Sequence, residues 1–285
     1  MCSPFEFRLI SLAFLLVFHQ INCKNVTFVP WPINITIEDL PQPYASSSVS
    51  KSPQIIRVPS KPLLYIPDGF TVKIYMSGLL SQRYLIYTPT DDILVSESSA
   101  NRISCLVDKD HDGYPDQRLT FVDASNGLNY SFGMAFINEY FYVGTGQVIM
   151  PYPQNGHSTR TIAISPMDDR IFVTSIQQAN INGSNQTTFA YGLRNVVGLA
   201  FHPITNDLYA TCQERGELGD DLVPDFFSHI EQNDFYGWSF AYMNLHLTDP
   251  RRFLTHSALL DMRFYTGKQF PSRYQNGAFA AFHGS

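Results

Sequence analysis

Two short segments of the sequence contain residue types that can move protons and stabilise negative charge. In NGHSTRT, His157 follows a glycine just ahead of an expected strand, and the usual pKa of imidazole near neutrality suits a general base. In YGLRNVVGL, Arg194 and Asn195 lie between glycines, and a guanidinium is a planar, permanent cation for a carboxylate or a developing oxyanion. A structural histidine and an arginine paired with an internal acid are the ordinary alternatives. These residue types therefore predict a polar site without fixing its role.

The segment QERGELGDDLVPD, residues 213–225, is rich in hard oxygen ligands. Two glycines, Gly216 and Gly219, let its backbone expose carbonyl groups. The carboxylates beside them are those of Glu214, Glu217, Asp220 and Asp221. Oxygen atoms at this density favour Ca²⁺, although solvated acidic turns are common.

Flat aromatic side chains follow in DFYGWSF, where Tyr236 and Trp238 flank Gly237. Such rings can stack on a planar cofactor, but packing in a β core is their more common use. The spacing alone leaves both uses open.

A second acidic segment, DKDHDGYPD, places Asp108, Asp110 and Asp112 at alternate positions before Gly113, as in the first half of an EF-hand loop. The twelfth position is Leu119, where an EF-hand needs a glutamate, and no helical pattern flanks the segment. We therefore expect a polar turn between strands with weak affinity for Ca²⁺ at most, separate from the main chemistry.

The elements that must position these residues are strands. Glycine and proline separate short runs of β-branched and aromatic residues, and helical periodicity is nearly absent. A unit of strand, polar turn and strand recurs along the sequence. The intervals between copies are uneven, but they lie near the length of a propeller blade, which is about 40 to 50 residues. The five copies are YLIYTPTDDILVS, FGMAFINEYFYVG, TIAISPMDDRIFVT, VGLAFHPITNDLYAT, and LLDMRFYTGKQFP with GAFAAFHGS. An all-β propeller is the predicted fold, with a large β-sandwich as the alternative.

Composition narrows the class of protein. The chain has 285 residues and a formal net charge of −6 without a basic stripe, which argues against nucleic-acid binding. Cys105 and Cys212 are the two cysteines downstream of residue 23, so a disulfide scaffold is excluded. They are either two buried thiols or one bridge.

The first residues predict export. The apolar run LISLAFLLVF after MCSPFEFR has the pattern of a secretory signal peptide over residues 1–23, and no second long apolar run follows that would span a membrane. Residues 24–63 are rich in Pro and Ser and predict an extended arm, and residues 64–285 form the propeller domain. The five Asn-x-Ser/Thr acceptors, which predict a secreted glycoprotein, are Asn25, Asn34, Asn129, Asn182 and Asn185.

From about Ile66 to its last residue the sequence resembles the soluble quinoprotein glucose/sorbosone dehydrogenases. The resemblance rests on GHSTRT, YGLRNVVGLAFHP, ERGELGDDLVPDF, FYGW, FYTGKQFP and AAFHGS, which occur here in the family's order. It implies a six-bladed β-propeller that binds pyrroloquinoline quinone (PQQ) and Ca²⁺ and oxidises a sugar or sugar aldehyde. An external electron acceptor would then reoxidise the quinone.

The resemblance also implies a role for each motif residue. His157 would remove the substrate's hydroxyl proton, Arg194 would hydrogen-bond the quinone oxygen that becomes negative, and Asn195 would help to hold the cofactor. The backbone carbonyls of Gly216 and Glu217 would bind Ca²⁺.

The sequence departs from the family pattern at several points. Val196 stands where the family has proline after Arg-Asn, and Gly216-Glu217 follows Glu214-Arg215 where the family has Asp-Gly. The sequence stops at HGS, where the family continues into a further blade, so we expect about four to five blades. The alternative to an active dehydrogenase is an inactive secreted propeller that serves as a binding module, or an incomplete fragment of such an enzyme.

Overall fold

The computed structural model describes residues 22–27, 39–47, 59, 62–138, 140–145, 161–174, 176–238 and 257–283. Within these ranges the regular structure is almost entirely strand, with three short 3-10 turns, which confirms the predicted all-β class. No helix among the described residues has the length and apolar character needed to cross a membrane. The chain divides into two compact units, Met1–Trp31 with Ile55–Pro153 and Pro32–Gln54 with Gln154–Ser285.

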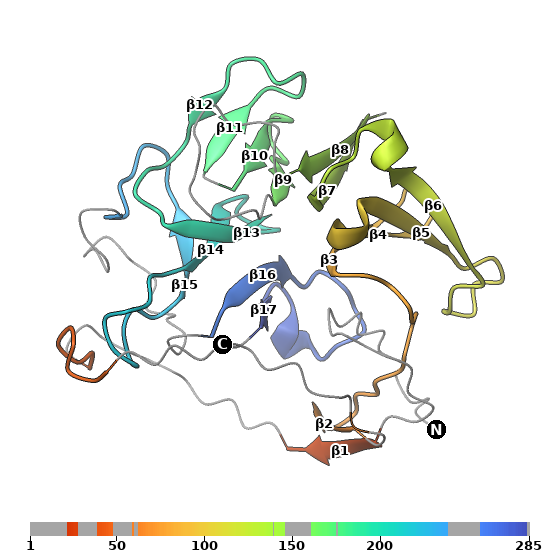
Figure 1. Cartoon of the computed structure of the whole chain (residues 1–285), viewed down its shortest axis with the longest axis horizontal. Helices are drawn as coiled ribbons and strands as arrows, with labels where there is room; N and C mark the ends of the chain where they lie inside the picture. Colours follow the sequence, from red (N-terminus) through yellow and green to blue (C-terminus); the bar gives the residue numbers. More distant parts are fainter. Residues whose placement is uncertain are drawn as a thin grey trace. The chain divides into compact units, whose positions relative to one another are not determined.

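The first unit contains three small sheets (Figure 1). Strand β1 (Asn22–Val26) pairs in parallel with β2 (Leu63–Pro67), so regular structure begins one residue before the predicted signal cleavage near Cys23. The four-stranded antiparallel sheet consists of β3 (Gln82–Tyr87), β4 (Ile93–Glu97), β5 (Arg102–Val107) and β6 (Gln117–Asp123). The third sheet pairs β7 (Ser131–Ile137) with β8 (Tyr140–Thr145). The 3-10 turns of this unit are Ser98–Ala100 and Ala124–Asn126.

The second unit also contains three sheets. The four-stranded one consists of β9 (Ile162–Ile164), β10 (Ile171–Val173), β11 (Gln177–Ala179) and β12 (Thr187–Thr188). The three-stranded one consists of β13 (Asn195–Phe201), β14 (Leu208–Gln213) and β15 (Phe226–Ile230). Strands β16 (Leu259–Phe264) and β17 (Ala278–Phe282) form the last, with the 3-10 turn Ser272–Tyr274 between them.

All five predicted hairpins are antiparallel pairs in the structure. They are β3–β4, β7–β8, β9–β10, β13–β14 and β16–β17. The turns follow from their polar residues: in the β13–β14 turn, His202 donates its backbone N–H to the carbonyl of Asp207, and Asn206 adopts the left-handed conformation with φ 62°. Local sequence therefore specifies these pairings.

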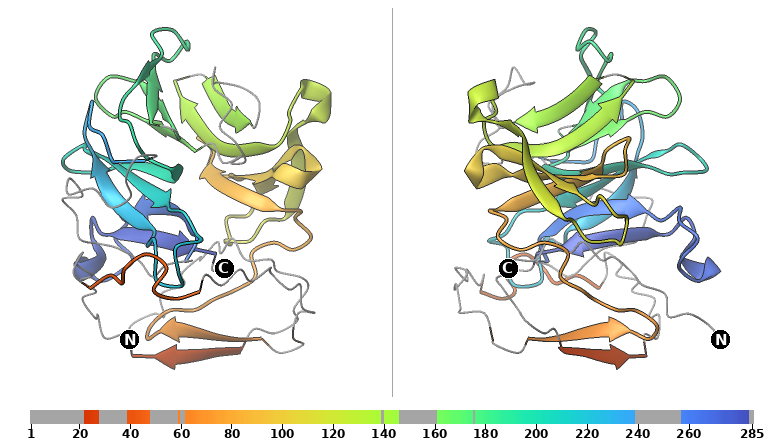
Figure 2. Two further views of the ribbon diagram at one scale, coloured as in Figure 1. Left: turned by 60° about the vertical axis from the view of Figure 1, so that its left-hand side comes forward. Right: turned by 90° about the vertical axis from the view of Figure 1, so that its right-hand side faces the viewer.

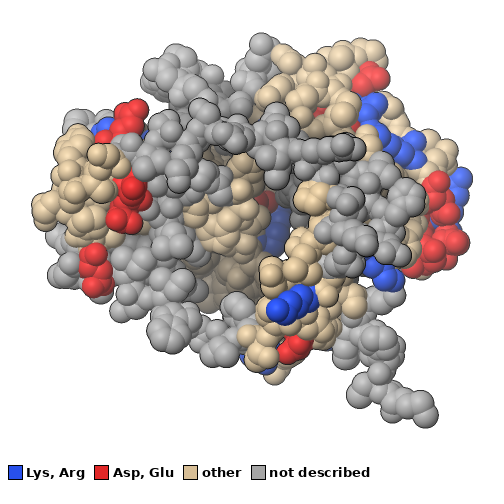
Figure 3. Space-filling view, turned by 60° about the horizontal axis from the view of Figure 1, so that its bottom comes forward, with Lys and Arg blue, Asp and Glu red and all other residues tan. Residues whose placement is uncertain are grey.

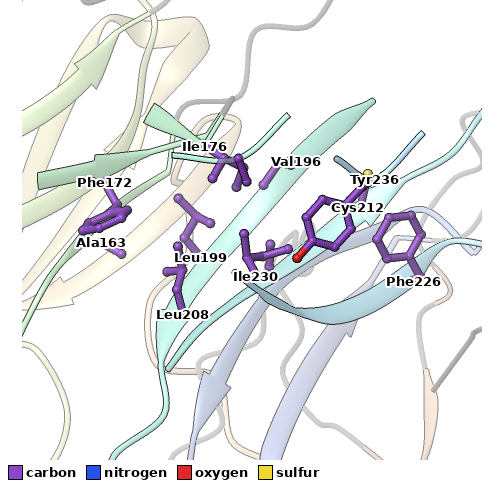
Figure 4. Packing of buried hydrophobic residues seen from close by; sticks show 12 residues of the cluster. Ala163, Phe172, Ile176, Val196, Leu199, Leu208, Cys212, Phe226, Ile230 and Tyr236 are labelled. Atoms are coloured by element: carbon purple, nitrogen blue, oxygen red, sulfur yellow. The ribbon is translucent and has the colours of Figure 1, made fainter. Parts of the chain in front are cut away.

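The largest core cluster of the second unit lies between the β9–β12 and β13–β15 sheets (Figure 4). Phe172 of the first sheet makes edge-to-face contacts with Phe189 and Phe201 at centroid distances of 5.0 and 5.3 Å. Leu199 and Leu208 of the hairpin β13–β14 are buried in the same cluster. Each sheet of this pair thus covers the apolar face of the other.

A glycine sets the distance between the β13–β15 sheet and β16. A Cβ on Gly198 would lie 2.7 Å from Oδ1 of Asp261 and 2.9 Å from its Cα, so only a glycine lets β16 approach this closely. Thr211 then joins the two sheets, because its hydroxyl donates to the carbonyl of Leu260 and accepts the N–H of Gly198, both at 2.8 Å. Figure 2 shows β16, in blue, beside the β13–β14 hairpin, in teal.

The two cysteines left open by the sequence are free thiols. Cys105 is half-buried in β5, and Cys212 is buried in β14. Burial raises the pKa of the Cys212 thiol well above its ordinary value, so this cysteine is an inert core residue.

A buried carboxylate stabilises the four-stranded sheet of the first unit. Glu97, whose side chain has no solvent exposure, accepts hydrogen bonds from Arg102, Arg118 and Ser104, and from the backbone N–H of Leu80 at 2.7 Å. Burial would raise its pKa, but these hydrogen bonds outweigh that effect and hold the pKa below the ordinary value of 4.5. The carboxylate therefore stays ionised and ties β4 to β5 and β6.

We predict that Glu97→Ala destabilises the protein by about 3 kcal/mol at pH 7, because two arginines lose a buried partner. A carboxyl with a lowered pKa contributes stability above its unfolded pKa and loses it as the pH falls, so the difference from wild type should shrink below about pH 4. Urea unfolding followed by circular dichroism at both pH values measures this. The control is Asp168→Ala, which removes an exposed partner of Arg170 and should cost less than about 1 kcal/mol. Equal losses in the two variants would contradict the prediction.

Candidate functional site

The predicted base, His157, lies outside the described residues. The other predicted site residues belong to the second unit and are described. The site is therefore built from the start of β13, the end of β14, the loop that follows it, and the segment 233–238.

Arg194 lies half-buried, immediately before β13. Its Nη1 atom donates to the backbone carbonyls of Glu214 at 2.9 Å and Gln213 at 3.3 Å. The indole ring of Trp238 lies against the guanidinium, 5.5 Å from its carbon to the ring centroid. Two carbonyls and one aromatic face thus fix this cation without neutralising it.

Two chain segments run side by side to bring Trp238 to Arg194. The N–H groups of Tyr236 and Trp238 donate to the carbonyls of Tyr191 and Gly192, at 2.9 and 2.8 Å. Gly192 has φ 71°, and a Cβ there would lie 2.6 Å from the Phe235 ring and 2.7 Å from the backbone nitrogen of Gly237. The glycine before Leu193-Arg194 is therefore required by the approach of the second segment.

Asn195 begins β13 and is held by a residue that the sequence analysis missed. Its side-chain amide donates to Oε1 of Gln213 at 2.8 Å, and Gln213 in turn donates to the carbonyl of Leu259 at 3.0 Å. Asn195 and Gln213 are register partners in the β13–β14 hairpin. A bulge between Val196 and Gly198 shifts the register by one residue, so counting outward from the predicted turn would have paired Asn195 with Glu214 and missed this contact.

Tyr236 lies in the core rather than beside Arg194. It is buried in the cluster of Figure 4, and its hydroxyl donates to the carbonyl of His229 at 3.1 Å and accepts the N–H of Glu231 at 3.0 Å. Burial raises its pKa to about 12. This geometry matches the core-packing alternative, while Trp238 lies half-buried against Arg194.

Two carboxyl groups in the loop after β14 differ in environment. Asp225 is buried and accepts the backbone N–H of Glu214 at 3.0 Å and of Leu259 at 2.8 Å, one on each oxygen. Among the residues that the structure describes, Glu214 accepts one long bond, 3.3 Å, from the N–H of Arg215. Burial raises the pKa of Glu214 to about 7, despite this bond and the nearby charge of Arg194. Asp225 thus fixes the loop to β16, and Glu214 is a carboxyl that titrates near neutrality.

The predicted calcium residues lie in the same loop. The carbonyl of Gly216 accepts a weak 3.4 Å bond from Nε of Arg215. Glu217 is exposed and left-handed, with φ 72°. Backbone oxygens in such a turn suit a hard cation, so the arrangement is compatible with the predicted role.

The predicted extended arm contributes residues 39–47 to the second unit. Tyr44 donates its N–H to the carbonyl of Leu218 at 2.7 Å, and the hydroxyl of Ser46 accepts the N–H of Asp220 at 2.9 Å. Leu40 packs on a small cluster formed by Leu218, Leu222 and Val223. Figure 2 shows this red-orange segment beside the loop. No periodicity in the sequence indicated that the arm would brace the loop.

The acidic segment 108–116 connects β5 to β6 in the first unit, as a polar turn between strands. Its carboxylates accept backbone N–H groups of the turn: Asp108 that of Gly113 at 2.9 Å, and Asp116 that of Lys109 at 2.7 Å. Ligand oxygens of Asp108, Asp110 and Asp116 lie within 4.8 Å of one another. The ninth residue of the segment thus completes the acidic group, in place of the twelfth that an EF-hand would use.

Charges of both signs occur on the face drawn in Figure 3, and its described part shows Lys and Arg interspersed with Asp and Glu. The described residues of this face carry no continuous basic stripe of the kind that tracks a nucleic-acid backbone.

No family model matches the chain. Among curated proteins, an uncharacterized protein of Borreliella burgdorferi is 27% identical over an alignment of 178 residues, and the match covers 50% of this chain and 47% of that protein. The chain thus spans about half the length of the curated relative it matches.

Solved structures show the fold. The chain is similar to the PQQ-bound aldose sugar dehydrogenase of Streptomyces coelicolor, with a TM-score of 0.50 and 18% identity over 67% of this chain and 73% of that one. A calcium structure of a Trichoderma reesei carbohydrate-active enzyme of family AA12 gives 0.55 and 16%, over 75% and 76%. An oxidoreductase of Thermus thermophilus described as a glucose dehydrogenase gives 0.53 and 17%, over 67% and 75%.

These likenesses confirm the predicted fold class: the chain has the all-β propeller fold of the PQQ sugar dehydrogenases, and the sandwich alternative is wrong. At identities below 20% they are likenesses of fold.

We predict that Gly192→Ala destabilises the protein by more than about 2 kcal/mol, because a Cβ meets both a left-handed backbone and a fixed neighbour. The matched control is Gly183→Ala, where φ is 78° but no atom lies within 4 Å of the added carbon, so only about 1 kcal/mol should be lost. Thermal unfolding measures both. In a Trp31→Phe background, the fluorescence emission of Trp238 should change in Gly192→Ala and stay unchanged in Gly183→Ala. Equal losses of stability in the two variants would contradict the close approach of residues 235–237 to Gly192.

We predict that Glu214→Gln raises stability at pH 8 by on the order of 1 to 2 kcal/mol and changes it little at pH 5. The pKa of Glu214 is raised from its ordinary 4.5 to about 7 in the folded protein, so ionising it costs folding free energy as the pH rises between these values. The neutral amide removes this cost. Melting temperatures at the two pH values test it, with the exposed neighbour Glu217→Gln as the control. A gain of the same size at both pH values would contradict the assignment.

Proposed function

We propose that this chain oxidises a sugar or sugar aldehyde by hydride transfer to bound PQQ, with Ca²⁺ as a Lewis acid. The observation that carries the proposal is the placement of Arg194, fixed by two backbone carbonyls and the Trp238 ring. A protein of the same fold is described as a PQQ-bound aldose sugar dehydrogenase.

The residues present suit a planar, anionic quinone. Both carbonyl bonds of Arg194 fall on Nη1, which leaves the rest of its guanidinium for a ligand. Asn195 is oriented by Gln213, and the indole of Trp238 offers a flat face nearby. A cation, an oriented amide and an aromatic ring are the groups that bind and polarise such a molecule.

Calcium fits the loop after β14. The carbonyls of Gly216 and Glu217 would hold it, because their loop is fixed at one end by Asp225 and braced by Ser46 of the arm. A related fold is described as a calcium structure.

The chemistry then divides among these groups. PQQ, when bound, supplies the acceptor for the hydride. His157 takes the hydroxyl proton of the substrate, and Arg194 stabilises the negative charge that develops on the acceptor oxygen, where a fixed cation acts most strongly. An external electron acceptor completes the cycle by reoxidising the quinone. The proposed place of this activity is outside the cell, which the signal-like pattern of residues 1–23 supports.

The first test is binding. The chain has two tryptophans, so Trp31→Phe leaves Trp238 as the reporter of the Arg194 neighbourhood. We expect PQQ with Ca²⁺ to quench its emission, and Arg194→Ala to weaken binding at least about tenfold through the loss of a charged hydrogen bond. Arg273→Ala, an exposed arginine stacked on Tyr274, is the control and should bind normally.

The second test is turnover. We expect aldoses to bleach bound PQQ and reduce an electron-accepting dye, and His157→Ala to abolish this while binding persists. A chain that unfolds cooperatively and neither quenches with PQQ nor reduces dye would overturn the proposal and favour an inactive binding module.

A further inference from the structure

The loop between β11 and β12 is an exposed hairpin tip with two glycosylation acceptors. Residues 182–187 are all exposed. The loop is closed by its own backbone: Asn180 donates its N–H to the carbonyl of Ser184 at 2.9 Å, and Gly183 donates to the carbonyl of Asn180 at 2.8 Å. It is therefore an ordered turn that projects its side chains into solvent.

The first acceptor, Asn182-Gly183-Ser184, has an orientation suited to modification. Oδ1 of Asn182 accepts both the backbone N–H of Ser184 at 3.0 Å and its hydroxyl at 2.6 Å. These bonds fix the amide through its oxygen. The amide nitrogen, which is the atom that would carry a sugar, takes no part in these two bonds.

At the other described acceptors, part of the Asn-x-Ser/Thr segment is buried or belongs to a strand. Asn129 is exposed, but Ser131, the hydroxyl residue of its acceptor, is fully buried at the start of β7. Asn25 lies within strand β1, in backbone pairing with β2. At Asn185, the hydroxyl residue Thr187 belongs to β12 and accepts a bond from Gln178 at 3.2 Å. Of these, Asn182 is the one whose whole acceptor lies in an exposed loop.

We propose that Asn182 carries an N-linked oligosaccharide. The donor is a lipid diphosphate-linked oligosaccharide: a bond forms between Nδ2 of Asn182 and the anomeric carbon, the bond from that carbon to the diphosphate breaks, and Nδ2 gives up a proton. Asn185 stays unglycosylated, because its Asn-Gln-Thr acceptor is translated after Asn182. It would have to enter the transferase while a bulky sugar is already attached three residues before it.

The glycan has a structural use at this position. Strand β12 is the outer strand of its sheet and ends the order β9–β10–β11–β12. An outer strand presents unpaired backbone groups that can recruit another chain, and a hydrophilic glycan beside it blocks such pairing. The proposal depends on this loop and on export of the chain by its signal-like N-terminus, and it holds whether or not PQQ binds.

The test uses the full chain with its own N-terminus, expressed in a eukaryotic secreting host. Trypsin should release Ile171–Arg194, which contains both asparagines. Enzymatic release of N-glycans in heavy-oxygen water converts a glycosylated asparagine to a marked aspartate. Mass spectrometry should place on Asn182, in most copies, a mark that is absent when the enzyme is omitted, because spontaneous deamidation before Gly183 takes up the same oxygen without a glycan.

Matched variants separate the acceptor from the fold. Asn182→Gln and Ser184→Ala should each remove the mark at Asn182, while Ser184→Thr restores a hydroxyl and should keep it. Asn180→Gln alters the same loop without touching an acceptor and should leave the glycan in place. An unmodified peptide from the secreted chain, a mark on Asn185 with Asn182 bare, or a chain retained in the cell without any glycan would each overturn the proposal.

Discussion

The candidate site depends on how one cation is held. Arg194 is half-buried where β13 begins and β14 ends, and backbone carbonyls hold it. Among the described residues no carboxylate forms an ion pair with it, so its charge is screened by dipoles and not cancelled. Backbone dipoles cannot be mutated or protonated away, and they keep the guanidinium oriented while its charge stays available to an anion. The surrounding frame, from Gly192 to Gln213, serves to maintain this orientation.

The nearby carboxyl groups complement that arrangement. Asp225 gives both of its oxygens to backbone N–H groups, one in its own loop and one on β16. Its carboxylate therefore links the loop after β14 to β16 through two hydrogen bonds. Glu214 has a single weak donor and a raised pKa, so its charge can be withdrawn near neutrality. The loop thus combines an end fixed by Asp225 with a carboxyl group, that of Glu214, whose charge changes near neutrality beside an arginine.

Local and non-local contacts differ in how far sequence predicts them. The hairpins were predictable, because alternating apolar residues and polar turns such as Pro203–Asp207 act within about fifteen residues of each other. The Asn195–Gln213 pair lies beyond a bulge between Val196 and Gly198 that shifts the register by one residue, so the turn alone does not predict it. The close approach at Gly198 depends on Asp261, which lies in another sheet, and no local pattern encodes it. Tyr236 and Trp238 look equivalent beside Gly237, and burial alone separates the core ring from the site ring.

The bracing of the site loop by the arm also bears on the order of folding. Ser46 and Asp220 are 174 positions apart in sequence, so the arm leaves the ribosome long before its partner exists. A polar, proline-rich composition is then an advantage, since such a segment neither collapses nor aggregates before the loop after β14 has been synthesised. Closing so long a loop is entropically slow, and this contact should be among the last to form. The loop after β14 thus receives its last support only when the second unit is complete, which couples the maturation of the candidate site to the completed fold.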